Sequence, residues 1–205
     1  MPNDHILQLA SLPVRQPKIG MALLRAHAIA AVIRLSLDPT RCPDATMSRA
    51  VAVEWIRKPG NDPPSTIQCE IGWDGVPDLT NCCATFQLTW NEQDLTELAA
   101  IAVVALLIQA LEGGVLERVL LVGSGGDYLV LTRRARKLDQ VEISGVREDA
   151  NGRATRKRLL EKADQVLTHS KVGFASVTAF THPPGANVRS CLHFVRRRRR
   201  KRKRR

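Results

Sequence analysis

Residues 123–145 have the sequence GSGGDYLVLTRRARKLDQVEISG, in which two apolar runs each carry an acidic residue. Asp127 comes directly before the run YLVL, and Glu142 lies inside the run VEIS. The β-branched and aromatic residues of these runs predict strands over 127–131 and 140–144. Acidic residues are unfavourable in strands, so Asp127 and Glu142 need a reason other than strand formation for being there.

The segments on either side of this stretch complete the order of elements. Asn91 is a suitable N-cap for a long helix, which is apolar nearly all round over 98–107 and is therefore expected to be buried. The predicted elements are a helix over 19–37, a hairpin of strands 51–56 and 67–71, a loop over 72–80, a helix over 92–111, strands over 115–122, 127–131 and 140–144, a helix over 153–167, and strands over 174–180 and 190–195. This order predicts an α/β fold with a mixed β-sheet flanked by helices, with an N-terminal β-hairpin and helix.

Composition divides the chain into three parts. Residues 40–48 are rich in Pro, Asp, Thr and Ser, which is typical of a linker. We therefore expect an N-terminal helical extension and linker over 1–48 and an α/β domain over 49–195. Residues 196–205 are all Lys or Arg, and such a run cannot bury apolar surface, so we expect a disordered basic tail.

The net charge of +11 belongs almost entirely to this tail, because the rest of the chain has 21 basic and 20 acidic residues. The tail could contact DNA, RNA, an acidic protein or an anionic membrane, or serve as a localisation signal, or have no role. Aromatic residues make up only 4% of the chain, which argues against recognition by base stacking. The tail residues expected to contact nucleic acid are Arg196, Arg200 and Arg205. In the turn over 132–137, the expected contacts are Arg133, Arg134, Arg136 and Lys137; a turn that only faces the solvent would have the same composition.

The cysteines and histidines give no clear metal motif. Five cysteines are an odd number, no C-x-x-C pair is present, and no secretory pattern opens the chain, so a reducing, cytoplasmic compartment is expected. Cys82 and Cys83 have no His or further Cys at zinc-ligand spacing and are expected as small buried side chains. The scattered residues His169, His182 and His193 are expected in surface or turn positions.

The apolar stretch over 19–37 is interrupted by Arg25, His27 and Arg34, so it is too charged to span a membrane. A transit peptide would also lack acidic residues, as residues 5–37 do. An amphipathic helix ended by Asp38-Pro39 explains the same sequence and is preferred.

The predicted order of helix, three strands, helix and strand resembles the restriction-endonuclease-like superfamily, also called PD-(D/E)xK nucleases. Glu97 lies in the first helix of that order, Asp127 on the second strand and Glu142 on the third. The segments GSGGDY (123–128) and VEISG (141–145) are also similar to the G-x-G-x-D-Y and L-E-V-S-G motifs of an uncharacterised bacterial family. The similarity to that family extends over residues 51–180. The resemblance implies a restriction-endonuclease-like core (αβββαβ), with Asp127 and Glu142 binding Mg²⁺ or Mn²⁺ and Glu97 positioning a water or a second ion; carboxylate clusters of this kind can activate water against a phosphodiester.

The superfamily usually has Lys two residues after the strand Glu, and this chain has Ser144 there. Members of the superfamily can supply the Lys from the following helix, where Lys157 and Lys162 are available. Lys162 is preferred because it shares a helix face with Gln165. Its ammonium would stabilise the charge that develops on the phosphate and orient the attacking water.

Structural roles explain each acid as well. Glu97 is favoured near a helix N-terminus, Asp127 can be a turn residue, and Glu142 can pair with Arg133 or Arg147. Three functions therefore stay open: a metal-dependent nuclease-like enzyme, a non-catalytic nuclease-fold protein that binds nucleic acid or protein, and a small structural or interaction protein whose tail is incidental.

Overall fold

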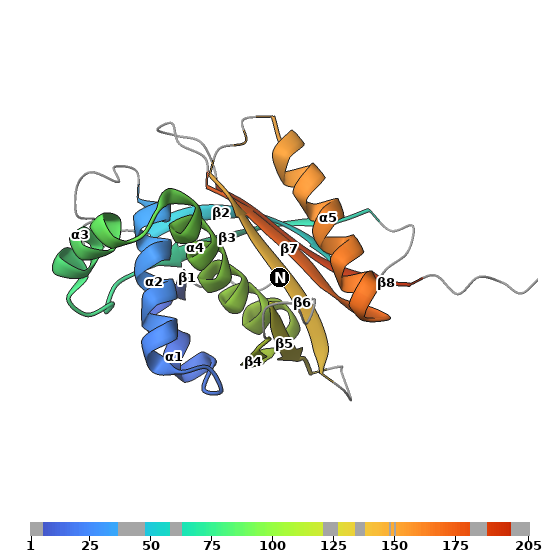
Figure 1. Cartoon of the computed structure of the whole chain (residues 1–205), viewed down its shortest axis with the longest axis horizontal. Helices are drawn as coiled ribbons and strands as arrows, with labels where there is room; N and C mark the ends of the chain where they lie inside the picture. Colours follow the sequence, from blue (N-terminus) through green and yellow to red (C-terminus); the bar gives the residue numbers. More distant parts are fainter. Residues whose placement is uncertain are drawn as a thin grey trace, which may run out of the picture.

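The computed structural model describes residues 6–36, 48–57, 63–120, 127–133, 138–147, 149, 151–180 and 188–197. These residues form an α/β structure with one eight-stranded sheet and helices on both of its faces (Figure 1). The strands are β1 (Ile6–Gln8), β2 (Ser48–Ile56), β3 (Ser65–Gly72), β4 (Val115–Val119), β5 (Tyr128–Leu131), β6 (Asp139–Val146), β7 (Val172–Ala179) and β8 (Val188–Arg196). The five α-helices of the described residues are α1 (Leu12–Arg15), α2 (Met21–Leu35), α3 (Leu79–Thr89), α4 (Glu92–Leu107) and α5 (Arg153–His169), with a 3₁₀ turn η1 (Leu9–Ser11) and a π-helical turn η2 (Ile108–Glu112).

The sheet has the strand order β1-β3-β2-β8-β7-β6-β5-β4. Strands β4, β5 and β6 are antiparallel neighbours, and the crossover helix α5 makes β7 parallel to β6. Strand β8 is antiparallel to β7 and parallel to β2, which forms the predicted antiparallel hairpin with β3. The predicted α/β class, mixed sheet and N-terminal hairpin are therefore confirmed.

Helix α4 is the central helix of the core. Its N-cap is Asn91, whose Oδ1 accepts a hydrogen bond from the Asp94 amide at 2.9 Å, and it continues through η2 to Gly113 in the left-handed conformation (φ 58°). It packs with α2 on one face of the sheet, while α5 covers the other face (Figure 1). The segment Glu92–Glu112 is long and apolar enough to cross a membrane, but most of it is buried inside the protein, as expected of a core helix.

The N-terminal residues belong to the same core as the rest of the chain. Strand β1 pairs with β3, and α2 packs on α4 with its apolar residues in the common hydrophobic cluster. The expected boundary near residue 49 therefore does not separate two cores. Residues 37–47, which hold most of the expected linker, lie outside the described residues.

Helix α3 forms partly within the stretch expected to be a loop. It begins after Asp78, which has a left-handed conformation (φ 52°) and makes no side-chain cap. Only Leu79 and Cys83 of this helix are buried, so it lacks the broad apolar stripe by which helices are recognised in a sequence.

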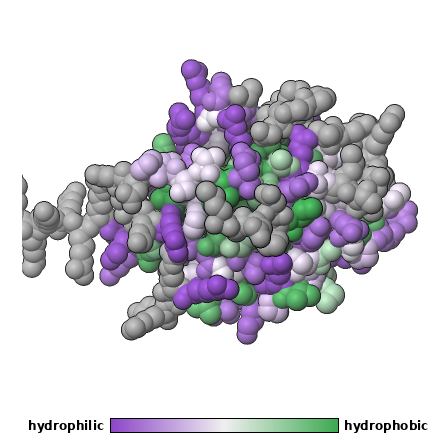
Figure 2. All heavy atoms as spheres, turned by 180° about the vertical axis from the view of Figure 1, so that it is seen from behind, coloured by the Kyte–Doolittle hydropathy of each residue, from purple (hydrophilic) through white to green (hydrophobic). Residues whose placement is uncertain are grey.

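On the face seen in Figure 2, hydrophobic side chains lie in small groups among hydrophilic ones.

A buried hydrogen bond joins α2 to the sheet. His27 Nε2 lies 3.1 Å from the hydroxyl of Tyr128, and His27 Nδ1 is buried without a hydrogen-bond partner in the described part of the chain. A second proton on this ring would be enclosed without solvent, so burial lowers the pKa of His27 from 6.5 to about 4.

Replacing His27 by Gln should make folding stability less dependent on pH. The unfolded chain takes up the His27 proton below pH 6.5 and the folded chain only near pH 4, so the stability due to neutral His27 is present above pH 6.5 and is lost as pH falls from 6.5 to 4. The loss is at most about 3 kcal/mol. Urea denaturation at pH 7 and pH 5 measures it, with the exposed His169→Gln as control. Equal pH dependence of His27→Gln and wild type would contradict this account.

Candidate active site

Strand β6 pairs with β7 along nearly its whole length, but it pairs with β5 over its first three residues only. It pairs with β7 from Gln140 to Val146, whereas β5 pairs with it over Asp139–Val141. Beyond Val141, the described residues provide no strand on the β5 side. An open strand edge presents amide groups that need acceptors.

Two of the predicted acids supply these acceptors. Asp127 Oδ2 accepts a hydrogen bond from the Ile143 amide at 2.5 Å, and Glu97 Oε2 accepts one from the Gly145 amide at 3.1 Å. Residues 143 and 145 alternate along the strand, so their amides point to the same edge. The two carboxylates therefore continue the hydrogen bonding of β6 beyond Val141, the last residue of β6 that pairs with β5.

Glycine at position 145 lets α4 approach this edge closely. A Cβ built on Gly145 would lie 2.3 Å from the backbone oxygen of Thr96, and Glu97 is the next residue of α4. The sequence suggested that Gly145 ends the strand, but β6 continues to Val146 and the reason for the glycine is this contact.

We expect Gly145→Ala to destabilise the protein by roughly 1–3 kcal/mol, because the added methyl group must push α4 away from β6. Gly20→Ala is the control, since nothing lies within 4 Å of the Cβ position at Gly20; its effect should stay within about 1 kcal/mol. Thermal or urea denaturation of both variants provides the comparison, and equal effects would show that the contact with Thr96 is unimportant.

The side chains of β6 that face α5 form the buried part of the site. Glu142 accepts a hydrogen bond from Gln140 Nε2 at 3.0 Å on one oxygen and lies 3.1 Å from Lys162 Nζ through the other. Lys162 Nζ also lies 3.5 Å from Asp127 Oδ2. The side chains of Glu142 and Lys162 are 4% and 10% exposed and that of Asp127 is 36% exposed, so solvent reaches the cluster from the Asp127 side.

The charge of this cluster is only partly balanced. Burial raises the pKa of the Glu142 carboxyl, and the negative charge of Asp127 raises it further, while Lys162 and Gln140 act in the opposite direction. Two carboxylates thus share one ammonium group in a place with little water. Protonation of Glu142 relieves the repulsion between the two carboxylates, and a bound cation would relieve it in the same way.

Ser144 connects Glu97 to helix α5. Its hydroxyl donates to Glu97 Oε1 at 3.0 Å and accepts from Arg158 Nε at 3.0 Å. Arg158 also forms an ion pair with Glu161 at 3.0 Å. Arg158 lies one helical turn before Lys162, so α5 presents two cations to β6.

The four predicted catalytic residues lie together. Lys162 contacts both Asp127 and Glu142, and Glu97 is linked to them through β6. Lys157, the other lysine considered, is exposed on α5. The roles assigned to these residues stay predictions.

The arginines considered as partners of Glu142 lie elsewhere. Arg147 is 3.4 Å from Glu92, and Arg133 packs its side chain beside Gly113. Arg133 and Arg196 are exposed, as nucleic-acid contacts require. Of the other predicted contacts, Arg134, Arg136, Lys137, Arg200 and Arg205 lie outside the described residues.

The sequence interpretation missed Gln140 and Arg158. Both could have been found from spacing, because Gln140 precedes Glu142 by two residues on a strand and Arg158 precedes Lys162 by four on a helix. Each spacing places the two side chains on one face of their element.

The donor atoms of the cluster suit a hard divalent cation. Mg²⁺ and Mn²⁺ prefer carboxylate oxygens and retain water ligands. Asp127 and Glu142 each offer such an oxygen within 3.5 Å of Lys162 Nζ, and the partial exposure of Asp127 gives access to water.

Comparison of the chain with protein-family models, with curated proteins and with solved structures found no match.

Replacing Lys162 by Met should destabilise the protein more at pH 8 than at pH 5.5. The variant leaves Glu142 and Asp127 without their shared cation, which costs roughly 1–3 kcal/mol when both are ionised. The pKa of Glu142 is already raised, so lowering the pH protonates it first and relieves the repulsion. Urea denaturation at the two pH values measures the difference, and Lys157→Met should match wild type. An equal loss at both pH values would mean that the lysine acts through its aliphatic chain.

Proposed function

We propose that this protein is a metal-dependent phosphodiesterase that cleaves nucleic acid. The observation that carries the proposal is the contact of Lys162 with both Glu142 and Asp127. Two carboxylates and an ammonium group converge beside β6, and such a set of charges suits phosphodiester hydrolysis.

The order of the surrounding elements supports a restriction-endonuclease-like core. Helix α4, the antiparallel strands β4, β5 and β6, helix α5 and strand β7 follow one another along the chain, and the four strands are neighbours in the sheet. This is the αβββαβ order that the sequence resemblance implies. The acids Glu97, Asp127 and Glu142 occur on or next to α4, β5 and β6, in the order expected for that core.

In this proposal, Asp127 and Glu142 hold Mg²⁺ or Mn²⁺. A bound ion of this kind supplies Lewis acidity and lowers the pKa of its water. Asp127 is the more exposed of the two and meets the solvent, while Gln140 fixes the carboxylate of Glu142 from behind.

The remaining residues have distinct parts. Lys162 places a positive charge where the phosphate oxygens become more negative in the transition state, the role that Lys in the strand motif would otherwise fill. Arg158 adds a second cation nearby. Both oxygens of Glu97 already accept hydrogen bonds from Ser144 and Gly145, so we assign Glu97 to positioning the edge of β6.

Basic residues away from the cluster would bring the nucleic acid to it. The tail over 196–205 carries ten of the 31 basic residues, and attraction of this kind does not depend on base sequence. Arg133 and the basic residues that follow it would contact phosphates in the same way. The cytoplasmic location inferred from the cysteines belongs to this proposal as well.

A non-catalytic function is the second candidate. Ser144 replaces the usual Lys, and the lysine that lies nearby is already paired with both carboxylates. A protein that retains the fold but only binds nucleic acid or another protein would show the same contacts.

Cleavage of single- and double-stranded DNA and RNA with Mg²⁺ or Mn²⁺ tests the proposal. Lys162→Met should lose about 10²–10³ in rate, because a preorganised charged donor is removed, and the exposed Lys157→Met should cut as wild type does. Glu142→Gln should lose metal binding and activity together, whereas the exposed Asp164→Asn should lose neither. Circular dichroism of each variant shows whether it is folded under the assay conditions.

Two results decide against this function. If wild type cuts none of the four substrates with either metal, the non-catalytic candidate is the better one. If wild type cleaves nucleic acid and folded Lys162→Met cleaves it equally fast, the protein is a nuclease but Lys162 does not stabilise the transition state.

A further inference from the structure

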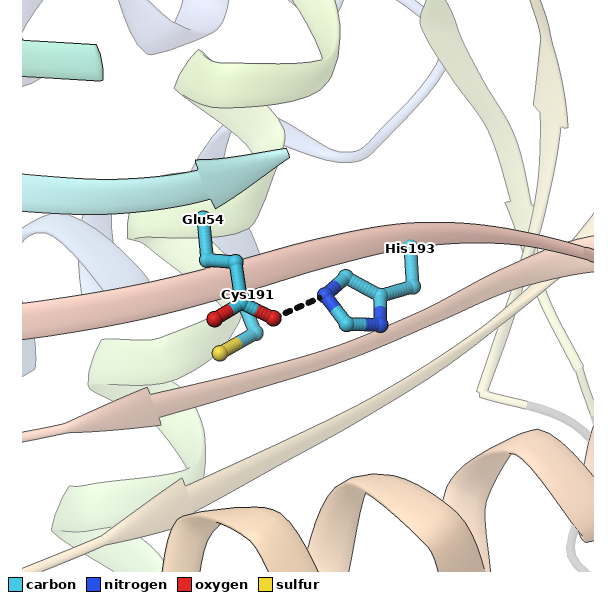
Figure 3. A group of neighbouring side chains, drawn as sticks. All are labelled: Glu54, Cys191 and His193. Carbon is cyan, nitrogen blue, oxygen red and sulfur yellow. Dashed lines mark ion pairs between the residues drawn. The ribbon is translucent and has the colours of Figure 1, made fainter. Parts of the chain in front are cut away.

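A second group of metal-ligating side chains lies on strands β2 and β8. These strands are parallel neighbours, and Glu54 is directly opposite Cys191 in their register. His193 follows Cys191 by two residues and therefore lies on the same face of the sheet. Figure 3 shows the carboxylate of Glu54, the thiol of Cys191 and the ring of His193 gathered at one place.

The three side chains are close enough to hold one ion. Their ligand atoms all lie within 4.8 Å of one another, and His193 Nε2 is 2.7 Å from Glu54 Oε1. The ligand atoms of a tetrahedral zinc site lie about 3–4 Å apart, since each is about 2.0–2.3 Å from the metal. Separations of up to 4.8 Å would have to shorten by about 1 Å to reach this spacing.

We propose that Glu54, Cys191 and His193 form a Zn²⁺ site. Sulfur, imidazole nitrogen and carboxylate oxygen are the three ligand types that zinc takes in proteins, whereas Mg²⁺ takes oxygen ligands. Three protein ligands leave one position of a tetrahedron open for water. The Glu54 side chain is 44% exposed and that of His193 15%, so an ion can enter from the Glu54 side.

The neighbouring charges are compatible with a bound cation. Glu54 and a Cys191 thiolate together would bring two negative charges to the divalent ion. Burial and the charge of Glu54 raise the pKa of the Cys191 thiol to about 12, and Arg156 of α5 and Arg189 of β8 oppose this only in part. Binding of Zn²⁺ would therefore displace the thiol proton.

This site is separate from the carboxylate cluster at Glu142. Both lie on the α5 side of the sheet, but β7 runs between them: Glu142 is opposite Ala175, and Ala175 is opposite His193. Two strand spacings are about 10 Å, which is too far for one ion to reach both groups. The zinc site therefore does not depend on the proposed nuclease function.

The experiment uses the full-length chain without an affinity tag, stripped of metal by a chelator. Equilibrium dialysis against Zn²⁺, with metal analysis of the protein, should show one tightly bound ion per chain. Co²⁺ in place of Zn²⁺ should give a thiolate-to-cobalt charge-transfer band in the near ultraviolet.

Variants assign the ligands. Cys191→Ser should abolish the cobalt band. Cys191→Ser and His193→Gln should each weaken Zn²⁺ binding by more than roughly tenfold, because even changes to residues that only orient a metal ligand reduce the affinity by about 10–100-fold. Cys82→Ser and His169→Gln are the matched controls, because these residues lie outside the cluster, and both should bind as wild type does. Asp127→Asn should also keep the zinc, which separates this site from the first.

The proposal is overturned if wild type binds no Zn²⁺ at micromolar concentrations, whatever the variants do. It is also overturned if Cys191→Ser binds Zn²⁺ as tightly as wild type, or if Co²⁺ binds without the thiolate band. In each of these cases, Glu54 and His193 form an ion pair only.

Discussion

The hydrogen bonds that Asp127 and Glu97 accept from the amides of β6 are the interaction on which the site depends. Strand β6 lies deep in the sheet, yet the amides of Ile143 and Gly145 have no strand to accept their hydrogen bonds on the β5 side in the described part of the chain. Buried amides must be paired, and here carboxylates pair them. Together with the buried Glu142, these carboxylates gather negative charge around β6, and Lys162 of α5 pairs with two of the three acids.

Each neighbouring element is placed to satisfy this arrangement. Helix α4 must touch β6 closely enough for Glu97 to reach an amide, and Gly145 permits that distance. Helix α5 must cross the other face with Lys162 over Glu142. The crossover from β6 through α5 to β7 provides this, since it returns the chain beside β6 in the parallel direction. The acids, the glycine and the lysine therefore form one interdependent set.

Local pattern was sufficient to predict the elements that are apolar and long. The α4 helix, its Asn91 cap and the hairpin of β2 and β3 follow from side chains that are neighbours in sequence. Helix α3 was missed because few of its residues are buried, and the place of β1 beside β3 depends on a long-range pairing that leaves no local pattern. The four residues Glu97, Asp127, Glu142 and Lys162 were singled out because their order along the chain suggested a known arrangement of elements, and the structure links their side chains in one network.

The group at Glu54 could not be found in this way, because its ligands come from strands that are far apart in the sequence and become neighbours only in the folded sheet. Cys191 and His193 alternate on one strand, which is a weak pattern by itself, and the third ligand lies more than a hundred residues earlier. A sheet that joins early and late strands brings such residues together on one face. On the same face, α5 covers β6 and β7 and shields Glu142 from water, whereas Glu54 on β2 remains partly exposed. The buried carboxylate of Glu142 is paired with the ammonium group of Lys162, whereas Glu54 is paired with His193 and is in contact with the solvent.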